Sequence, residues 1–460
     1  MLLVDIRYEG DAAFVRRIKN FTRGVRASIR CPVEDRRDLM SERDPRISVQ
    51  YMASVTRDAL VQRLWDGDRA VLFHDLNRLR DRVARLTAAF PDTTLHAIAI
   101  KANPLVEILR TVVHVGAGLE AASIEEVHLA LAAGCEASKI VYDGPAKTRA
   151  ELAEVARLGI HVNVDNFDEL ARVDPGRATW GLRVNPGGDS GDIQLTTASG
   201  RSAKFGVPFG AAHERDAVLD AFAANPWLST LHSHVGSQGY GMDRLVEAVG
   251  SVVALRDWIN GQLGRPQIAT IDMGGGLPAR YRSNRQEPTI GEYAAALRSR
   301  LREFDQTRWI TEFGRSIQAS CGWAVSRVEY IKSIGQQRLA VIHVGGDFLM
   351  RPVYHPGDWH HDIVVLDAGG YLKSGTPRPW TVGGPLCFGG DIVARDRELP
   401  DVEAGDLLLI RDTGAYTLSL WSRHCSRGVP IVLGCDGDGI RVLRQAEQPA
   451  DVVSLWSRDR

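Results

Sequence analysis

The stretch Leu95-His-Ala-Ile-Ala-Ile-Lys-Ala-Asn-Pro104 is a short apolar run that ends in a lysine. It predicts a buried strand, and Asn103 with Pro104 predicts the start of a helix directly after it. The lysine is unusual in this chain, because only seven of its 56 lysines and arginines are lysines. A lysine amine can lose its proton and attack an aldehyde, whereas the guanidinium of an arginine stays protonated. Lys101 is therefore a candidate for covalent chemistry, and the alternative is a strand-end lysine that points into solvent.

The composition indicates an ordinary globular protein with room for two domains, since 44% of its 460 residues are hydrophobic and 25% are charged. A formal net charge of −1 gives no overall field that would attract nucleic acid or an anionic membrane. The first residues carry charges where a signal peptide needs an apolar run, and no apolar run approaches the roughly 18–20 residues of a membrane span. We therefore expect a cytoplasmic protein that binds neither nucleic acid nor membranes.

The cysteines and histidines do not predict a metal site. The six cysteines are scattered without a C-x-x-C pair, which also argues against a disulfide framework. His232 and His234 have the spacing of metal ligands, but no third ligand lies at a suitable distance along the sequence. We therefore expect no bound metal.

The middle of the chain alternates short apolar runs with helical patterns. Eight such units in about 220 residues match a (β/α)8 TIM barrel, whose typical length is about 250 residues. We expect this barrel over residues 71–320, and a doubly wound open sheet is the alternative. The eight strand-like runs are His96–Lys101, Leu119–Ala122, Lys139–Tyr142, His161–Val164, Trp180–Val184, Thr230–Val235, Ala269–Met273 and Trp309–Glu312.

The sequence beyond residue 320 changes character, because Gly and Pro separate β-rich segments and long helical patterns are absent. We expect a C-terminal β-domain over residues 321–460, completed by strands from the N-terminal segment 1–70. No role can be assigned to residues 1–50. The β-rich segments are Trp323–Ile331, Arg338–Val344, Asp362–Leu366, Asp406–Ile410 and Val429–Leu433.

Unusual residues gather where the predicted barrel strands end, which is where ligands bind in this fold. One such residue alone is weak evidence, because a triple glycine is usually a turn and a single histidine is usually a core residue. Several at one rim of one barrel predict a ligand site. They are Lys101, Glu120, His234, Gly274–Gly276 and the segment Glu312-Phe-Gly-Arg315.

These motifs resemble the fold-type III pyridoxal-phosphate (PLP) enzymes, the family of diaminopimelate and ornithine decarboxylases. The family's lysine strand is typically A-x-K-A/C-N, which Ala99-Ile-Lys101-Ala-Asn103 matches. Gly384-Pro-Leu-Cys-Phe-Gly-Gly-Asp391 resembles its G-P-x-C-[D/E]-x-x-D segment, and Gly414-Ala-Tyr416 its G-A-Y. The resemblance covers residues 70–440, and the segments His232–Gln238 and Gly116–Ser123 are closer to the diaminopimelate branch than to the ornithine branch.

The resemblance implies PLP as the cofactor, an alanine racemase-like fold, and decarboxylation of an amino acid as the reaction. Lys101 would bind the aldehyde of PLP, Glu312 would pair with its pyridine nitrogen, and His234 would stack on its ring. The family's cysteine, here Cys387, acts as a proton donor in the active site of a neighbouring subunit, which implies a homodimer with shared sites. The other implied cofactor-binding residues are Glu120, Ser237, Gly274, Gly275, Gly276, Gly314, Arg315 and Tyr416, and the implied substrate-binding residues are Arg315, Arg351, Tyr354, Cys387, Phe388 and Tyr416.

Three departures from the family pattern are present. Glu312-Phe-Gly-Arg315 stands where the family has E-P-G-R, but the charged residues are kept. Tyr354 lies one residue earlier than in the R-P-x-x-Y of diaminopimelate decarboxylases, and Phe388 replaces the acid that contacts the far amino group of the substrate. We therefore expect a decarboxylase without strict specificity for diaminopimelate. The alternatives are a PLP-dependent racemase or epimerase on the same fold and a non-catalytic binding homologue.

Overall fold

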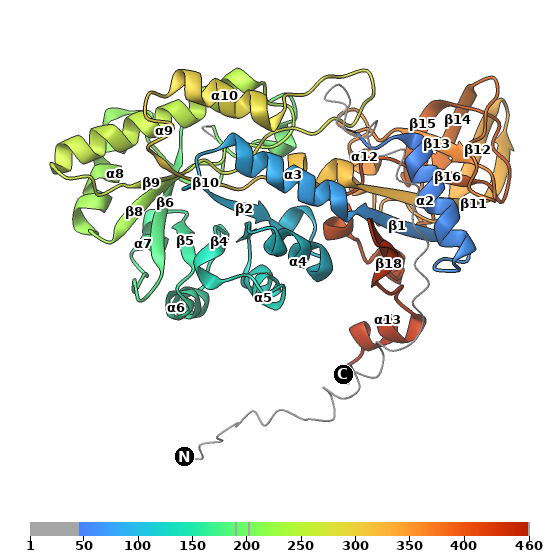
Figure 1. Cartoon of the computed structure of the whole chain (residues 1–460), viewed down its shortest axis with the longest axis horizontal. Coiled ribbons are helices and arrows are strands. Elements are labelled where there is room, and N and C mark those ends of the chain that lie inside the picture. The colour runs from blue at the N-terminus through green and yellow to red at the C-terminus, as the bar shows by residue number, and fades with distance from the viewer. Residues whose placement is uncertain (1–45, 189–190, 201–202, 459–460) are drawn as a thin grey trace, which may run out of the picture.

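The computed structural model describes residues 46–188, 191–200 and 203–458, and it places a barrel beside a β-rich domain (Figure 1). Residues 1–45, for which the sequence suggested no role, lie outside the described residues. None of the helices in the described residues combines the length and the apolar character needed to cross a membrane.

Eight parallel strands close into the predicted barrel. Each strand pairs with its neighbours, β5 pairs with β6, and β10 pairs with β2, so the ring has no open edge. A closed ring excludes the doubly wound sheet, which is open by definition. The barrel strands are β2 (Leu95–Ala99), β3 (Gly118–Ala121), β4 (Ile140–Tyr142), β5 (His161–Val164), β6 (Thr179–Asn185), β8 (Leu228–His232), β9 (Thr270–Asp272) and β10 (Arg308–Thr311), and the short β7 (Val207–Pro208) pairs with β6.

Helices surround the barrel (Figure 1), and their starts follow the expected capping rules. In α6, Thr148 and Glu151 form a complete capping box. In α5, the Ser123 hydroxyl accepts the N–H of Glu126 as expected, but the Glu126 carboxylate accepts the N–H of Ala122. The helices are α3 (Leu76–Ala89), α4 (Val106–His114), α5 (Ile124–Ala132), α6 (Arg149–Leu158), α7 (Phe167–Leu170), α8 (Ala212–Ala224), α9 (Met242–Leu263), α10 (Ile290–Arg300) and α11 (Arg315–Gln318).

The lysine stretch ends differently from the prediction. Strand β2 stops at Ala99, Ile100–Ala102 forms one 3₁₀ turn, and α4 begins only at Val106. Pro104 disfavours a helical conformation of the residue before it, and Asn103 is extended at φ −156° and ψ 109°. Lys101 therefore lies on a turn just beyond the strand, at the C-terminal rim of the barrel.

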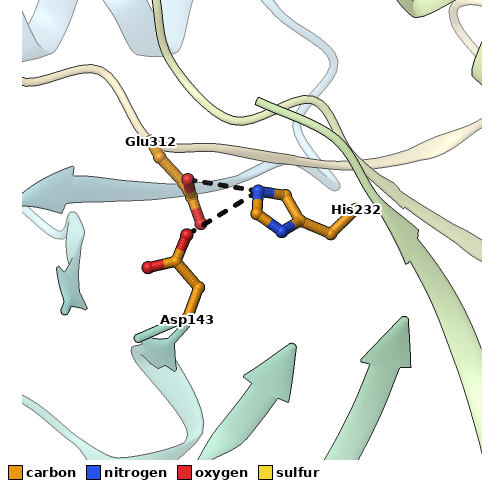
Figure 2. A group of neighbouring side chains, drawn as sticks. All are labelled: Asp143, His232 and Glu312. Atoms are coloured by element: carbon orange, nitrogen blue, oxygen red, sulfur yellow. Dashed lines mark ion pairs between the residues drawn. The ribbon is translucent and has the colours of Figure 1, made fainter. Parts of the chain in front are cut away.

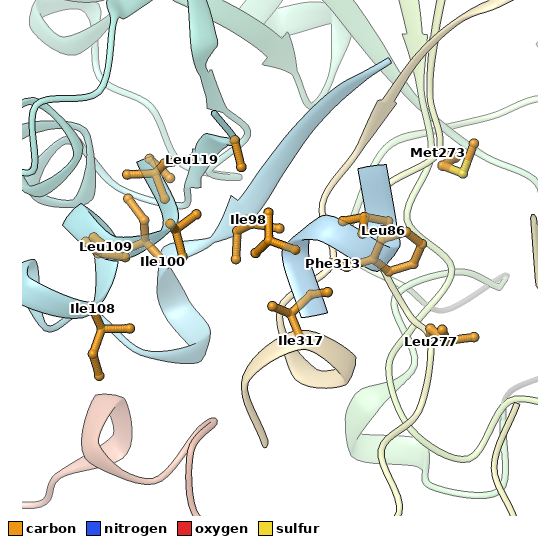
Figure 3. Packing of buried hydrophobic residues seen from close by; sticks show 14 of the residues in the cluster. Leu86, Ile98, Ile100, Ile108, Leu109, Leu119, Met273, Leu277, Phe313 and Ile317 are labelled. Atoms are coloured by element: carbon orange, nitrogen blue, oxygen red, sulfur yellow. The ribbon is translucent and has the colours of Figure 1, made fainter. Parts of the chain in front are cut away.

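Apolar side chains in the protein core fix the backbone that leads into this turn. Ile98 and Ile100 are fully buried and belong to the same core cluster as Leu119, Phe313 and Ile317, which come from a neighbouring strand and from the segment after β10 (Figure 3). Burying such side chains contributes roughly 1.5–3 kcal/mol each. The core thus holds the backbone that leads into Lys101.

The β-domain combines one early strand with the C-terminal part of the chain. Strand β1 (Ala70–Asp75), which lies at the start of the stretch predicted for the barrel, pairs antiparallel with β11 and parallel with β17. Helix α2 (Val49–Val61) packs in the same core cluster as Phe73 and Trp323, whose rings stack at 5.0 Å. The later elements are β11 (Gly322–Ile334), β12 (Gln337–Ile342), α12 (Met350–Tyr354), β13 (Ile363–Leu366), β14 (Arg378–Gly383), β15 (Ile392–Leu399), β16 (Leu407–Ile410), β17 (Ile431–Asp436), β18 (Gly439–Arg444) and α13 (Pro449–Trp456).

Three of these strands, β14, β15 and β18, were missed in the sequence. Strand β15 contains the charged run Arg395–Glu398, β18 contains two arginines, and β14 contains Pro379. Such half-exposed strands lack the continuous apolar run that marks the buried strands of the barrel.

Candidate active site

Lys101 lies among buried carboxylates at the barrel rim. Its Nζ is 2.5 Å from Oε1 of Glu120, a residue of β3 that is completely buried. Burial opposes the charge on Lys101, but the carboxylates of Glu120, Asp143 and Glu312 outweigh it and raise the pKa of the lysine well above its usual value. The protein therefore holds Lys101 as an ammonium ion in this structure.

A second group of side chains lies beside this ion pair (Figure 2). Nε2 of His232 is 3.5 Å from Oε2 of Glu312 and 3.8 Å from Oδ2 of Asp143, and all three side chains are buried. They come from the ends of β8, β10 and β4, which adjoin the same rim. Burial lowers the pKa of His232, so its imidazole is neutral.

No metal was expected at His232, because no third ligand lies at a suitable spacing in the sequence. The structure nevertheless brings further ligand atoms close to this histidine. Asp143, His232 and Glu312 offer three ligand atoms within 4.8 Å of one another, although they are far apart in sequence. His234, the other histidine of the motif, does not belong to this group, because its Nδ1 accepts the N–H of Gly275 at 3.0 Å. The charges of Lys101 and Arg183 next to the same carboxylates oppose a bound cation.

Two of the carboxyl groups hold protons near neutral pH. Burial, together with the charge of Asp143, raises the pKa of Glu312 to about 8. Burial, together with the charge of Glu312, raises the pKa of Asp272 to about 7. A cationic group next to Glu312 would reverse this effect, because it favours the ionised carboxylate.

The glycine loop after β9 is shaped by close contacts. A Cβ atom on Gly275 would lie 2.6 Å from the carbonyl oxygen of Glu312, and one on Gly276 would lie 2.5 Å from that of Gly236. Gly274 has φ +63° and would place a Cβ 2.8 Å from Nδ1 of His234. Glycine is therefore required at all three positions.

Arg315 follows the barrel's last strand and is almost completely buried. Its Nε donates to Oγ of Ser237 at 2.8 Å, and its NH1 donates to the hydroxyl of Tyr281 at 3.0 Å. Its guanidinium also lies 4.9 Å from the ring centre of Trp359 and 4.4 Å from that of Tyr416. No ion pair neutralises Arg315 within the part of the chain that the structure describes.

Arg351 of α12 faces the same two rings as Arg315. Its guanidinium lies 4.6 Å from the ring centre of Trp359 and 4.4 Å from that of Tyr416. Burial, with the charge of Arg315, lowers the pKa of Arg351 to about 9. Two neighbouring guanidinium groups without an acid partner in the described residues form a site for an anion.

The β-domain contributes Tyr416 by direct contact with the lysine turn. The backbone N–H of Tyr416 donates to the carbonyl of Ala102 at 2.7 Å, and Nδ2 of Asn103 donates to the carbonyl of Gly414 at 3.2 Å. A Cβ on Gly314 would meet Ala99 and Ala102 at 2.9 Å, so Gly314 lies against the same turn.

The remaining predicted residues form a separate group. The rings of Tyr354 and Phe388 stack at 5.7 Å and 11°, and Cys387 is exposed beside them. Within the described residues, no hydrogen bond, ion pair or ring contact joins these three residues to the group around Lys101. One chain therefore brings most of the predicted site residues together and leaves Cys387, Phe388 and Tyr354 apart from them.

Several residues of the site were not found from the sequence. Asp143 directly follows β4, the same position that marked the other rim residues, so this signal was present and missed. Trp359 and Tyr281 lie in irregular segments without a motif. The missed residues are Asp143, Arg183, Asp272, Tyr281 and Trp359.

Comparison with known proteins agrees with this geometry. The family described as "Pyridoxal-dependent decarboxylase, pyridoxal binding domain" matches residues 76–319. The chain belongs to this family. The protein uses PLP as its cofactor. It is a PLP-dependent carboxy-lyase that acts on an amino acid, as the resemblance implied.

The relatives also support the diaminopimelate branch. A diaminopimelate decarboxylase of Pseudomonas aeruginosa is 32% identical over 363 residues, which are 77% of this chain and 84% of that protein. One of Deinococcus radiodurans is 32% identical over 405 residues, with 87% and 98% covered. The crystal structure of diaminopimelate decarboxylase from Helicobacter pylori complexed with L-lysine has a TM-score of 0.76 at 28% identity and covers 84% of this chain and 96% of that one.

The residues at the rim fit PLP. The glycine loop packs closely against Gly236, and the next residue, Ser237, accepts a hydrogen bond from Arg315, so backbone, hydroxyl and guanidinium groups that could bind a phosphate are near one another. Oε1 of Glu312 is buried and has no hydrogen-bond partner in the described residues, which suits a protonated pyridine nitrogen. Lys101 supplies the only amine in this cluster of described side chains.

The raised pKa values predict how stability depends on pH in protein stripped of PLP. The carboxyl group of Glu312 has a pKa of about 8 in the folded state, against about 4.3 in the unfolded state. Between these two pH values the folded state therefore binds more protons than the unfolded state. Stability should therefore fall as pH rises from about 5 to 8. Glu312→Gln, which cannot ionise, should gain on the order of 1–3 kcal/mol over the wild type by pH 8.

Urea denaturation of both proteins across this pH range measures the effect. Glu398→Gln, at an exposed position, is the control and should follow the wild type. Parallel pH profiles for wild type and Glu312→Gln would show that Glu312 does not hold the proton.

Proposed function

We propose that this enzyme decarboxylates an amino acid whose far end lacks an amino group, and that Lys101 holds its PLP. The observation that carries this is the position of Lys101 Nζ, which lies among buried carboxylates at the same barrel rim as the glycine loop and Arg315. A non-catalytic binding protein would have no need for an amine in this position. The diaminopimelate and lysine/ornithine decarboxylases that the chain resembles support decarboxylation over racemisation.

Each residue of the site would have a specific role in this reaction. PLP accepts the electron pair left behind when the substrate's carboxyl group departs as CO2. Glu312 would hold the proton on the pyridine nitrogen, and His234 would lie against the ring as a neutral imidazole. Gly274–Gly276, Ser237 and Arg315 would bind the phosphate with Tyr416, and Cys387 would return a proton from its Sγ to the substrate carbon.

Borohydride reduction tests the position of the cofactor. Reduced PLP should be found on the peptide that contains Lys101, because this amine alone lies among the rim residues. Lys147 is a matched internal control, since it is also buried in the barrel and pairs with Glu169 at 2.8 Å. Mass spectrometry that placed the cofactor on Lys147 or another lysine would refute the assignment.

We propose that the active enzyme is a homodimer with shared sites. In this structure Cys387 is exposed and apart from the Lys101 group, which is the arrangement expected if it serves the site of a partner subunit. Inactive Lys101→Ala and inactive Cys387→Ala subunits should then regain part of the activity when mixed, because each heterodimer contains one complete site. Full activity of a monomer, shown by sedimentation at assay concentration, would contradict this proposal.

The far end of the substrate would meet Phe388 and Arg351. An acid at position 388 would offer an ammonium group a hydrogen bond worth roughly 1.5–3 kcal/mol, and a phenyl ring offers none. Asp391 does not substitute for it, because this buried carboxylate accepts the N–H groups of Gly346 and Leu386. Arg351, which has no acid partner among the described residues, would instead favour a carboxylate or another negative group on the substrate.

Substitution of Phe388 tests this preference. The wild type should use diaminopimelate, lysine and ornithine poorly compared with amino acids without a terminal amine. Phe388→Glu should shift kcat/KM towards the diamino acids by about tenfold to a hundredfold, and Phe388→Leu, which adds no charge, should not. A wild-type enzyme that strongly prefers a diamino acid would show this interpretation of Phe388 to be wrong.

A further inference from the structure

Two exposed cysteines of the β-domain, Cys387 and Cys425, are in contact. The backbone N–H of Cys387 donates to Sγ of Cys425 at 3.4 Å. The other described cysteines, Cys135, Cys321 and Cys435, are all buried. This pair could not be predicted from the sequence, because its members are 38 positions apart.

The contact belongs to a wider junction of two loops. Next to the cysteines, the ring of Phe388 lies edge-on to that of His424 at 5.9 Å. Two successive residues of one loop thus lie against two successive residues of the other. The two cysteines are therefore held next to each other by contacts between both loops and not by a single side chain.

Buried or paired acids anchor each loop. The carboxylate of Asp391 accepts the N–H of Leu386 at 2.7 Å, which fixes the loop of Cys387. Nε of Arg427 pairs with the fully buried Asp347 at 3.1 Å, and Arg423 forms two hydrogen bonds to Glu447, which fixes the loop of Cys425. A disulfide needs Cα atoms about 4.4–6.8 Å apart, and the Sγ of Cys425 already lies 3.4 Å from the backbone N of Cys387, so the two residues are direct neighbours.

Metal binding does not explain the pair. Within residues 46–458, apart from the four undescribed positions, the single cluster of three or more metal-ligand side chains is the one at His232. His424, although adjacent to Cys425, presents its ring to Phe388. Two thiols without further ligands are better suited to oxidation than to zinc.

We propose that Cys387 and Cys425 form an oxidisable thiol pair that hydrogen peroxide converts to a disulfide. One thiolate attacks the peroxide, the O–O bond breaks, and a sulfenic acid forms as the first water is released. The second sulfur then attacks the sulfenic sulfur, so that the S–S bond forms, the S–O bond breaks and a second water leaves. The thiols lose two electrons and two protons in total, and the peroxide is reduced to two waters.

The consequence for activity rests on the proposed function. A disulfide leaves Sγ of Cys387 without a proton to donate, so oxidation should stop the reaction. A proton donor of this kind contributes on the order of a hundredfold or more to the rate. Because Cys425 has no part in the proposed chemistry, its removal should leave the basal rate unchanged.

The test treats the PLP-loaded enzyme with hydrogen peroxide, then with dithiothreitol, and maps its peptides after alkylation. The wild type should yield a linked peptide pair containing Cys387 and Cys425, lose activity on the order of a hundredfold, and recover with dithiothreitol. Cys425→Ser should start with normal activity, form no link, and fail to recover after excess peroxide, because an unpartnered sulfenic acid oxidises further. Peptides with Cys135 and Cys321 should stay reduced and serve as the internal control.

Three outcomes would overturn the proposal, and a fourth would separate it from the proposed function. Oxidation of Cys387 to a sulfinic acid without a link in the wild type would overturn it, as would a link between two subunits on a non-reducing gel. Equal recovery of Cys425→Ser would also overturn it. A link that forms while activity is kept would support the thiol pair and remove Cys387 from the proposed reaction, so the two ideas fail separately.

Discussion

A buried excess of negative charge around one lysine is the constraint on which this site depends. Removing a carboxylate from water without compensation costs several kcal/mol, so four of them in one cluster must be neutralised. Two formal positive charges are available, and the raised pKa values of Glu312 and Asp272 show where protons make up the difference. A protonated pyridine nitrogen would supply the same charge, so the cluster is matched to a cationic ring. The four acids are Glu120, Asp143, Asp272 and Glu312, and the two bases are Lys101 and Arg183.

Barrel closure makes this charge arrangement possible. Each acid comes from or directly follows a different strand, so only the ring of parallel strands brings them to one rim. The β-domain completes the arrangement through backbone contacts with the lysine turn. Tyr416 adopts a left-handed conformation at φ +56°, which costs roughly 1–2 kcal/mol, while its N–H bonds to the carbonyl of Ala102. Its ring centre lies 4.4 Å from the guanidinium groups of both Arg315 and Arg351.

The barrel could be predicted from the sequence, since each of the eight strand-like runs overlaps one of its strands. The sequence was also sufficient for Lys101, the glycine loop and Arg315 because these residues stand next to apolar runs in recognisable motifs. It was not sufficient for Trp359, which lies in an irregular segment and reaches the site only through the packing of the second domain. Nor could it pair Cys387 with Cys425 or Glu312 with Asp143, because such contacts depend on the three-dimensional arrangement of strands and loops.

The two departures from the family pattern at Tyr354 and Phe388 are one structural change. Tyr354 is displaced by one position and Phe388 replaces an acid, and the structure stacks these two rings on each other at 5.7 Å. Arg351 lies three residues before Tyr354 on α12, so both side chains extend from the same short helix. An acid at position 388 would lose this ring contact, while a phenyl ring gains contact area with Tyr354. The loss of the acid and the shift of the tyrosine therefore support each other physically, and the positive charge of Arg351 remains as the polar feature of α12 that faces the rings of the site.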